Sequence, residues 1–322
     1  MEILTCECGS LSLQETYANK WLEPKNRLHP DSLRVLKSVG MPERIPVAWR
    51  AAVEDYSRMD LTCPADMLQA ISGISKTVME ATNWTYVAGL WKENLLTDLM
   101  WNTINAKVAA RSKIWRAPTF SWASIMNIGP KDRPDRAHIS YELLVFLRNG
   151  LDESNKAWRT DFYASVVDTS CVPVDKDVTG QLTSGFIVLR GTLIAADLCR
   201  IASRTYNEWQ IVPIGGQHLE SSFLYPDISL DRTEHGFEGT TRVYCLKLVG
   251  TSKYVSDSRR EYLLYLVLRN ATPEDSYPQP SRGSHTFERI ALYRDARDPD
   301  EGQLEDISGE SNIERDALVN VV

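Results

Sequence analysis

The chain has 322 residues, of which 43% are hydrophobic and 25% are charged, and its formal net charge is −7. This composition is that of an ordinary globular protein. Its six cysteines are too scattered for a disulfide framework. The nine acidic and two basic residues of positions 295–322 account for the net charge, so residues 1–294 are close to neutral. We therefore expect no nucleic-acid partner, because such binding needs a basic patch.

The sequence also argues against a membrane protein and a metalloprotein. No run approaches the ~18 apolar residues of a membrane-spanning helix, and the N-terminus lacks a charged-then-apolar signal peptide. We therefore expect a cytoplasmic protein without a membrane partner. Cys6 and Cys8, with His29 further on, resemble half of a zinc site, but no second ligand pair completes it. We expect neither a metal nor a cofactor.

Residues 1–128 show mainly the apolar spacing of helices. The loose alternation from position 2 to 13 predicts an edge strand. Four helices are then expected: a short one over 31–40, one from Pro46 through Tyr56, one after Thr62 with Pro64 in its first turn, and one over 88–102. Gly73 within the apolar stripe of the third helix predicts close packing against a neighbouring element.

The stretch at 117–124, Ala-Pro-Thr-Phe-Ser-Trp-Ala-Ser, gathers much of the aromatic content. Pro118 prevents a helix from running through it. Phe120 and Trp122 alternate with small residues, which is strand periodicity. We expect this stretch to join a helical front part to a strand-rich back part, and its two aromatic rings to be core residues.

Residues 129–294 have the pattern of a β-rich part. Seven strands are expected, at 141–147, 162–167, 185–194, 209–212, 243–249, 262–268 and 286–293. Gly185 and Gly191 bracket the most apolar run and predict bulges or a bend. The expected fold is α+β, with the helical part packed on an antiparallel β sandwich or open barrel that shares its core. The acidic stretch at 295–322 is expected to be disordered.

Sequence motifs of common enzymes are missing. The chain has no GxSxG elbow, no GxGxxG or GxxxxGK[ST] loop and no HExxH motif. Arg58 and Asp60 could form an ion pair that fixes the turn between two helices. Arg289 is a lone charge among the apolar residues of the last predicted strand. It either needs a buried partner or lies on an edge strand, where a charge limits aggregation.

Several segments share a pattern with one known family. They are VEDYSR at 53–58, LT at 61–62, DMLQAISGI at 66–74, YVAGLW at 86–91, LMW at 99–101, APTFSWAS at 117–124 and FERIAL at 287–292. Together they resemble the C-terminal region of fungal heterokaryon-incompatibility (HET) proteins. The residues that carry this resemblance are Tyr56, Arg58, Asp66, Gly73, Gly89, Trp91, Pro118, Ser121, Trp122, Ser124 and Arg289.

The resemblance covers only the part of such proteins that follows the HET domain. The Ser-Tyr-x-Trp-Gly and Trp-Ile-Asp motifs of that domain do not occur in this chain. The HET domain is similar to Toll/interleukin-receptor domains and is linked to cell death, so no death-inducing or NAD-cleaving residue can be transferred. The chain would then be a fragment, a short paralogue or a remnant.

The resemblance therefore implies a non-catalytic interaction or regulatory region that acts in fungal self/non-self recognition and programmed cell death. Its expected partner is a protein, such as a HET domain in cis or in trans. Two alternatives stay open. One is a hydrolase-like enzyme with a site between the two parts, near Trp122 and His138. The other is a small-ligand or glycan-binding β module that uses the 213–239 loop, with Phe223, Tyr225 and Phe237 facing solvent.

Overall fold

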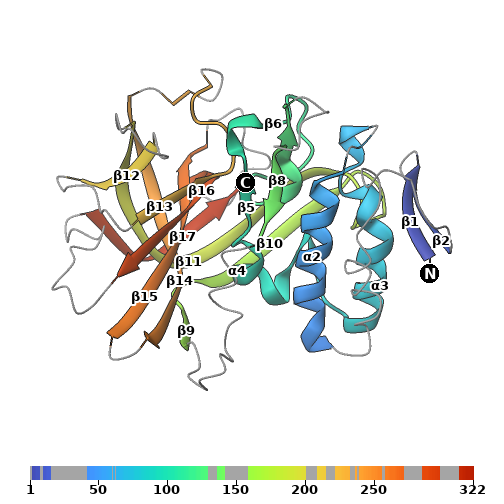
Figure 1. Ribbon diagram of the computed structural model, residues 1–322, viewed down its shortest axis with the longest axis horizontal. Coiled ribbons are helices and arrows are strands. Elements are labelled where there is room, and N and C mark those ends of the chain that lie inside the picture. Colours follow the sequence, from blue (N-terminus) through green and yellow to red (C-terminus); the bar gives the residue numbers. More distant parts are fainter. Residues whose placement is uncertain are drawn as a thin grey trace.

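The computed structural model describes most of the chain. The described residues are 2–7, 10–15, 42–59, 61, 63–129, 136–141, 159–200, 209–214, 222–232, 236–237, 239–255, 258–271, 285–297 and 312–322. Helices lie on one side of the molecule and a large sheet lies on the other (Figure 1). The expected order of a helical part followed by a strand-rich part is thus seen in the described residues.

The described helical part combines α-helices with single 3-10 turns. The α-helices are α2 (Ile45–Ser57), α3 (Ser72–Thr82) and α4 (Leu95–Asp98). The 3-10 turns are η2 (Pro42–Arg44), η3 (Pro64–Asp66), η4 (Gln69–Ile71), η5 (Lys92–Asn94), η6 (Ala106–Val108) and η7 (Trp122–Ser124). The helix predicted from Pro46 to Tyr56 is confirmed as α2, which buries Trp49, Val53 and Tyr56.

Two of the predicted helices differ in the structure. The helix expected after Thr62 starts only at Ser72, and the two turns η3 and η4 precede it. The helix expected over 88–102 is wrong at its start, because β3 (Tyr86–Val87) and β4 (Leu90–Trp91) form a hairpin there. Ala88 and Gly89 have φ of 49° and 89°, which are the positive values that a two-residue hairpin loop requires. This turn interrupts the helical spacing.

Short strand pairs surround the helices. β1 (Glu2–Glu7) pairs with β2 (Ser10–Glu15), so the strand expected over 2–13 is a hairpin. β5 (Asn102–Ile104) pairs with β8 (His138–Ser140), and β6 (Ala109–Arg111) pairs with β7 (Ile125–Asn127). The 117–124 stretch is not a strand, since Ser121 caps the 3-10 turn η7 by accepting from the backbone N–H of Ala123. The predicted helix over 31–40 and most of the predicted strand over 141–147 lie outside the described residues.

A nine-stranded sheet forms the rest of the described chain. Its strands are β9 (Arg159–Phe162), β10 (Ser165–Pro173), β11 (Leu182–Arg200), β12 (Trp209–Pro213), β13 (Ser222–Pro226), β14 (Thr240–Val255), β15 (Ser258–Asn270), β16 (His285–Arg297) and β17 (Ile313–Val321). The strands predicted from 185 onward are confirmed and are longer than expected, whereas the one predicted over 162–167 is interrupted between β9 and β10. The sheet is mixed, because β16 and β17 pair in parallel while the other pairs are antiparallel.

Strand β11 closes part of this sheet into a ring. It pairs with β17 along its first half and with β14 along its second half, and β17–β16–β15–β14 are neighbours in that order. Five strands therefore form a closed circuit rather than a sandwich or an open barrel. The β11–β17 register shifts between Gly191 and Leu193, so the bulge predicted at Gly191 is confirmed. Gly185 pairs in regular register with Cys171, so the bulge expected there is wrong.

Both faces of the sheet are buried at β15. In β15, Leu264, Leu266 and Leu268 belong to one hydrophobic cluster, while Leu263, Tyr265 and Val267 belong to another. This explains the continuous apolar run of β15, because a strand buried on both sides does not alternate with polar residues. The first cluster also contains the buried side chains of α2 and of η7, so one apolar core extends from the helices into the ring.

The end of the chain differs from the disordered tail that the acidic composition predicts. Residues 313–321 form β17 between β11 and β16, and residues 298–311 lie outside the described part. Val319 and Val321 are wholly buried, whereas Leu318, which precedes them, is 45% exposed. The backbone N–H of Thr119 donates to the carbonyl oxygen of Val322 at 2.9 Å. The apolar residues at the end of the tail therefore allow it to form a strand in spite of the acidic residues before them.

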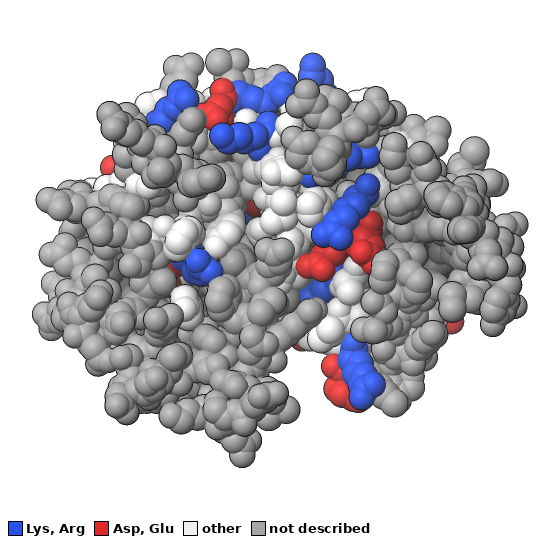
Figure 2. All heavy atoms as spheres, in the orientation of Figure 1, with Lys and Arg blue, Asp and Glu red and all other residues white. Residues whose placement is uncertain are grey.

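The described charges are distributed in small groups on the face drawn in Figure 2, and several of these groups contain both signs. An ion pair joins the two parts of the molecule, because Lys76 of α3 lies 2.7 Å from Asp177, in the turn between β10 and β11. Among the described helices, none is long and apolar enough to cross a membrane.

Candidate functional site

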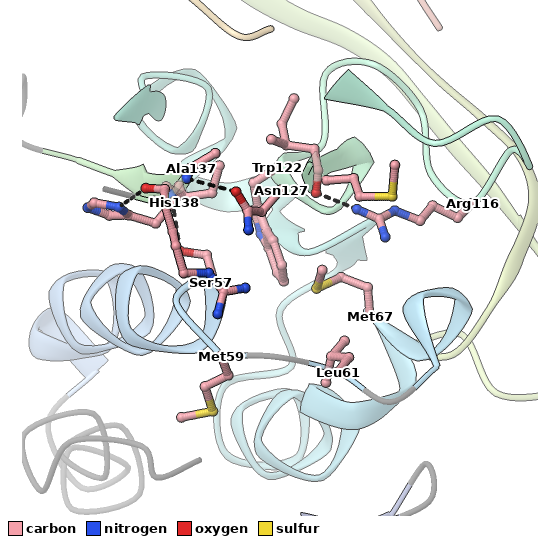
Figure 3. Close-up of a pocket in the computed structure, with 13 residues that line it drawn as sticks. Ser57, Met59, Leu61, Met67, Arg116, Trp122, Asn127, Ala137 and His138 are labelled. Carbon is pink, nitrogen blue, oxygen red and sulfur yellow. Dashed lines mark hydrogen bonds between the residues drawn. The ribbon is translucent and has the colours of Figure 1, made fainter. Parts of the chain in front are cut away.

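A pocket of about 230 Å³ lies between the end of α2 and the segments that follow η7. The residues that line it are Ser57, Met59, Leu61, Met67, Arg116, Trp122, Ile125, Met126, Asn127, Arg136, Ala137, His138 and Ile139. Figure 3 shows Met59, Leu61 and Met67 on one side and Trp122, Asn127 and Arg116 facing them. The pocket therefore lies near Trp122 and His138, but its described lining residues all lie between positions 57 and 139, so none of them belongs to the nine-stranded sheet.

The indole of Trp122 forms a fixed apolar wall of this pocket. Its Nε1–H donates to the carbonyl oxygen of Gly89 at 2.8 Å, and its ring packs edge-on against Tyr56 with centroids 6.0 Å apart. The hydroxyl of Tyr56 donates in turn to the carbonyl oxygen of Met67 at 2.9 Å. These contacts hold the wall in one orientation, because the indole and the phenol are both hydrogen-bonded at their polar ends.

The polar and charged side chains of the pocket include those of Arg116, Arg136 and His138. Arg116 is buried, and its guanidinium donates to the carbonyl oxygen of Ile125. Burial is the main cause that lowers the pKa of Arg116 to about 10, so it stays charged at neutral pH. His138 Nδ1 lies 3.1 Å from the carbonyl oxygen of Arg136, and this nitrogen must carry the proton because a carbonyl only accepts.

Asn127 joins the pocket to the strand pairs around it. Its Oδ1 accepts from the backbone N–H of Gly129 at 3.3 Å and from that of Ala137 at 3.2 Å. It lies at the end of β7, while His138 begins β8. The amide thus connects two segments that are separated by residues outside the described part, and it fixes the polar rim of the pocket.

The hydroxyl of Ser57 in this pocket is engaged with the backbone. The hydroxyl of Ser57 donates to the carbonyl oxygen of Glu54 and accepts from the backbone N–H of Ile139, both at 2.9 Å. Among the described residues that line the pocket, none is acidic. A serine hydroxyl occupied in this way is poorly placed to attack a substrate.

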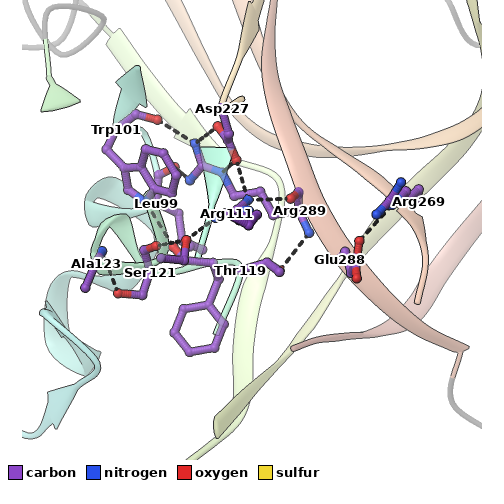
Figure 4. Close-up of polar contacts among 12 residues, drawn as sticks. Leu99, Trp101, Arg111, Thr119, Ser121, Ala123, Asp227, Arg269, Glu288 and Arg289 are labelled. Atoms are coloured by element: carbon purple, nitrogen blue, oxygen red, sulfur yellow. Dashed lines mark hydrogen bonds and ion pairs between the residues drawn. The ribbon is translucent and has the colours of Figure 1, made fainter. Parts of the chain in front are cut away.

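A second polar centre lies where the 117–124 stretch meets the sheet. Arg289 of β16 is wholly buried, and its guanidinium binds both carboxylate oxygens of Asp227, at 2.9 and 3.0 Å (Figure 4). It also donates to the carbonyl oxygens of Leu99 and Trp101, and lies 3.5 Å from the centroid of the Trp101 ring. Of the two roles considered for Arg289, the structure therefore shows the buried one, because β16 has neighbours on both sides.

Asp227 serves two cations at this centre. Arg111 of β6 lies 3.2 Å from Asp227 Oδ2, and its guanidinium also donates to the hydroxyl of Ser124. Burial lowers the pKa of Arg111 to about 10, and the attraction of Asp227 opposes that shift. Because both guanidinium groups bind this carboxylate and also donate to backbone carbonyl oxygens, we interpret this centre as structural.

Most of the motif residues take part in packing. Gly89 accepts from the indoles of Trp49 and Trp122, and Ser121 donates to the carbonyl oxygen of Ala88. Trp91 is buried, and its backbone N–H donates to Asp98, which pairs with Arg50 at 2.8 Å. The carbonyl oxygen of Pro118 accepts from the backbone N–H of Ser121. The hydroxyl of Ser124 donates to the carbonyl oxygen of Ser121. The carboxylate of Asp66 accepts from the side-chain amide of Gln181.

Two motif residues lie in different surroundings from those expected. Gly73 is exposed, and a Cβ built on it has no atom within 4 Å, so the prediction of close packing is wrong. Arg58 is 54% exposed and lies 3.8 Å from Asp55, one turn back on α2, while its expected partner Asp60 lies outside the described residues. The exposure of Gly73 follows from its position on the solvent side of α3, between the buried Ile71 and Ile74.

The loop proposed for glycan binding is only partly exposed. Phe223 is 42% exposed, and the guanidinium carbon of Arg294 lies 4.6 Å from its ring centroid. Tyr225 is half-buried, and Phe237 is buried against Trp209. Aromatic sugar-binding platforms need exposed ring faces, so the described part of this loop gives little support to that alternative.

The sequence patterns did not identify several charged residues of the buried ion pairs and of the pocket. Asp227 lies in the long 213–239 loop, Asp98 ends α4, and Arg111 ends β6. Arg116 and Arg136 are separated by twenty positions, yet both line one pocket. The only available signal was the isolated charge of Arg289, which requires a partner if it is buried but does not say where in the chain that partner lies.

Comparisons of the chain with protein-family models, with curated proteins and with solved structures find no match. A functional conclusion for this protein therefore depends on the resemblance in residues 53–124 and on the geometry of the pocket beside Trp122.

Proposed function

We propose that this chain is a non-catalytic interaction and regulatory region of a fungal HET-type protein, acting in the cytoplasm in self/non-self recognition and programmed cell death. The observation that carries the proposal is the joint packing of the motif residues around the carbonyl oxygen of Gly89. That oxygen accepts from Trp49 at 3.1 Å and from Trp122 at 2.8 Å. Segments that resemble the family at 53–58, 86–91 and 117–124 meet within this cluster.

The state of the hydroxyl groups supports a non-catalytic role. Ser57, Ser121 and Ser124 all donate to backbone carbonyl oxygens. A nucleophilic serine instead needs a hydrogen bond to a base that can take its proton. We accordingly propose no catalytic residue and no cofactor for this region.

The partner that the resemblance implies is a HET domain, in cis or in trans. A test would mix the purified chain with a separately purified fungal HET domain and measure complex formation by isothermal titration calorimetry. We expect a saturable complex that is lost when the chain is heat-unfolded beforehand. Absence of a complex with HET domains, including one taken from a protein with a matching C-terminal region, would overturn the proposed partner.

A second measurement separates the proposal from the hydrolase alternative. The chain is assayed for turnover of p-nitrophenyl acetate, with Ser57→Ala as the comparison. We expect the same background rate for both proteins. Turnover by the parent chain that Ser57→Ala abolishes would replace the non-catalytic assignment with an enzymatic one.

A further inference from the structure

We infer that the loop after β6, residues 112–115, is a docking surface for an acidic segment of a protein partner that also carries an apolar side chain. This inference goes beyond the proposed function, because it names a surface and the chemistry of what binds there. It does not depend on the HET resemblance, so a failed titration with HET domains would leave it standing.

The loop presents two adjacent large apolar side chains to solvent. Ile114 is 81% exposed, whereas the other exposed large apolar side chains of the described residues are at most 52% exposed. Trp115 beside it is 40% exposed. Single exposed apolar residues are common on protein surfaces. A tryptophan next to an isoleucine this exposed is instead typical of a contact site, because tryptophan is enriched among the residues that dominate binding energy.

A pocket of about 200 Å³ lies beside Trp115. The residues that line it are Arg111, Ser112, Lys113, Trp115, Arg116, Ala117, Thr119, Ser124, Glu288 and Val322. It is distinct from the pocket beside Trp122, with which it shares only Arg116 among the described lining residues. An apolar protein cavity of roughly 150 Å³ already admits benzene, so this pocket has room for one large side chain of a partner.

The charge around the loop favours an acidic partner. Residues 99–131 contain five cations and no acid. The two arginines of the pocket already bind other groups, but no ion pair or hydrogen bond in the described part of the chain engages the exposed side chain of Lys113. Glu288 is only 8% exposed and pairs with Arg269 at 2.7 Å (Figure 4). Lys113 is therefore the cation that a carboxylate of the partner can reach, which gives the surface its specificity.

A protein segment fits this surface better than a lipid membrane does. One isoleucine and one tryptophan bury little apolar area, and even a single myristoyl chain gives only marginal membrane binding. The pocket beside Trp115 adds contact area only for a partner with a side chain that can enter it.

Three peptides of equal length test the charge preference. They are EEELFEEE, QQQLFQQQ and KKKLFKKK, acetylated and amidated, titrated into the full chain at about 50 mM salt by isothermal titration calorimetry. We expect the acidic peptide to bind with a Kd below about 1 mM and at least about fivefold more tightly than the other two. Equal affinity for the acidic and basic peptides, or no binding of the acidic peptide, would overturn the inference. So would binding to phosphatidylserine vesicles that Trp115→Ala abolishes, if the acidic peptide does not bind.

Variants locate the binding. Lys113→Gln is expected to weaken the acidic peptide by about threefold to fivefold and to leave the glutamine peptide unchanged. Trp115→Ala and Ile114→Gln are expected to weaken both peptides, and their unfolding midpoints should stay at that of the parent chain. Lys176→Gln is the matched control, because Lys176 is an exposed lysine in the turn between β10 and β11. Acidic-peptide affinity that is unchanged in Lys113→Gln and Trp115→Ala, or that falls equally in Lys176→Gln, would contradict the surface.

Discussion

The guanidinium Nε of Arg289 lies 2.9 Å from Oδ2 of Asp227, although the two residues are 62 positions apart and both side chains are wholly buried. This pair joins β16 to the segment after β13, and its further bonds to Leu99 and Trp101 reach the helical part. Arg111 shares the same carboxylate. A single buried anion therefore fixes three segments of the chain relative to one another.

The first prediction concerns that anion. Asp227→Asn keeps the shape of the side chain but leaves Arg289 and Arg111 without their shared negative charge, so the free energy of unfolding should fall by about 3–5 kcal/mol. The measurement is urea-induced unfolding. Asp197→Asn is the control, because the more exposed Asp197–Arg242 pair should contribute less than about 1 kcal/mol. Equal effects of the two variants would contradict the organising role of Asp227.

The second prediction compares two glycines of the family pattern. Gly89 has φ of 89°, and a Cβ there would lie 2.7 Å from Nε1 of Trp122, so Gly89→Ala should markedly lower the unfolding midpoint. Gly73→Ala meets no atom within 4 Å in an exposed helical position and should raise stability by about 0.5–1 kcal/mol. Thermal unfolding of both variants tests this, and a stabilising Gly89→Ala would show that the hairpin geometry is wrong.

The third prediction concerns the indole that forms the pocket wall. Trp122→Ala removes a fully buried ring and should cost about 3–5 kcal/mol and lower the soluble yield. Trp122→Phe keeps a ring but loses the bond to Gly89, whose carbonyl still accepts from Trp49, so its cost should be smaller. Trp115, which is 40% exposed, provides the control. If Trp122→Ala unfolds at the same denaturant concentration as Trp115→Ala, the 117–124 stretch does not organise the core.

The fourth prediction concerns the last strand. Val319→Ala should cost about 2 kcal/mol, because it removes two buried methyl groups inside the sheet. Leu318→Ala, at the neighbouring exposed position, should change stability by less than about 0.5 kcal/mol. Chemical unfolding distinguishes these values. Two equally harmless variants would favour the disordered tail that the acidic composition suggests.

The fifth prediction concerns thiol reactivity. Burial raises the pKa of Cys171 and of Cys245 to about 12, so at pH 9 only about one thiol in a thousand is ionised at either position. Iodoacetamide at pH 9 should therefore modify the exposed Cys63 long before these two, as followed by peptide mass spectrometry. The raised pKa also means that their contribution to stability is complete at neutral pH and is lost as the pH rises toward 12. Rapid modification of Cys245 in the folded chain would contradict its burial.

Part of this fold can be predicted from local sequence alone. Helix α2 follows from Pro46 and the apolar spacing up to Tyr56, and the long strands follow from continuous β-branched and aromatic runs. The bulge at Gly191 was also predictable, because a glycine within an apolar strand is a common site of irregular pairing. These features depend on residues within about ten positions of one another.

Other features depend on contacts between distant segments, and only the tertiary structure decided them. The hairpin at 86–91 overrides a helical spacing because the carbonyl oxygen of its Gly89 turn receives two indole N–H groups from elsewhere in the chain. Strand β17 forms because β11 and β16 provide hydrogen-bonding partners on both of its sides. The partner of Arg289 and the presence of Arg116 and Arg136 in one pocket are equally non-local. The sequence by itself determined most of the helices and strands. Only the tertiary structure decided which buried charges pair with one another, because burial makes a partner necessary without specifying its position in the chain.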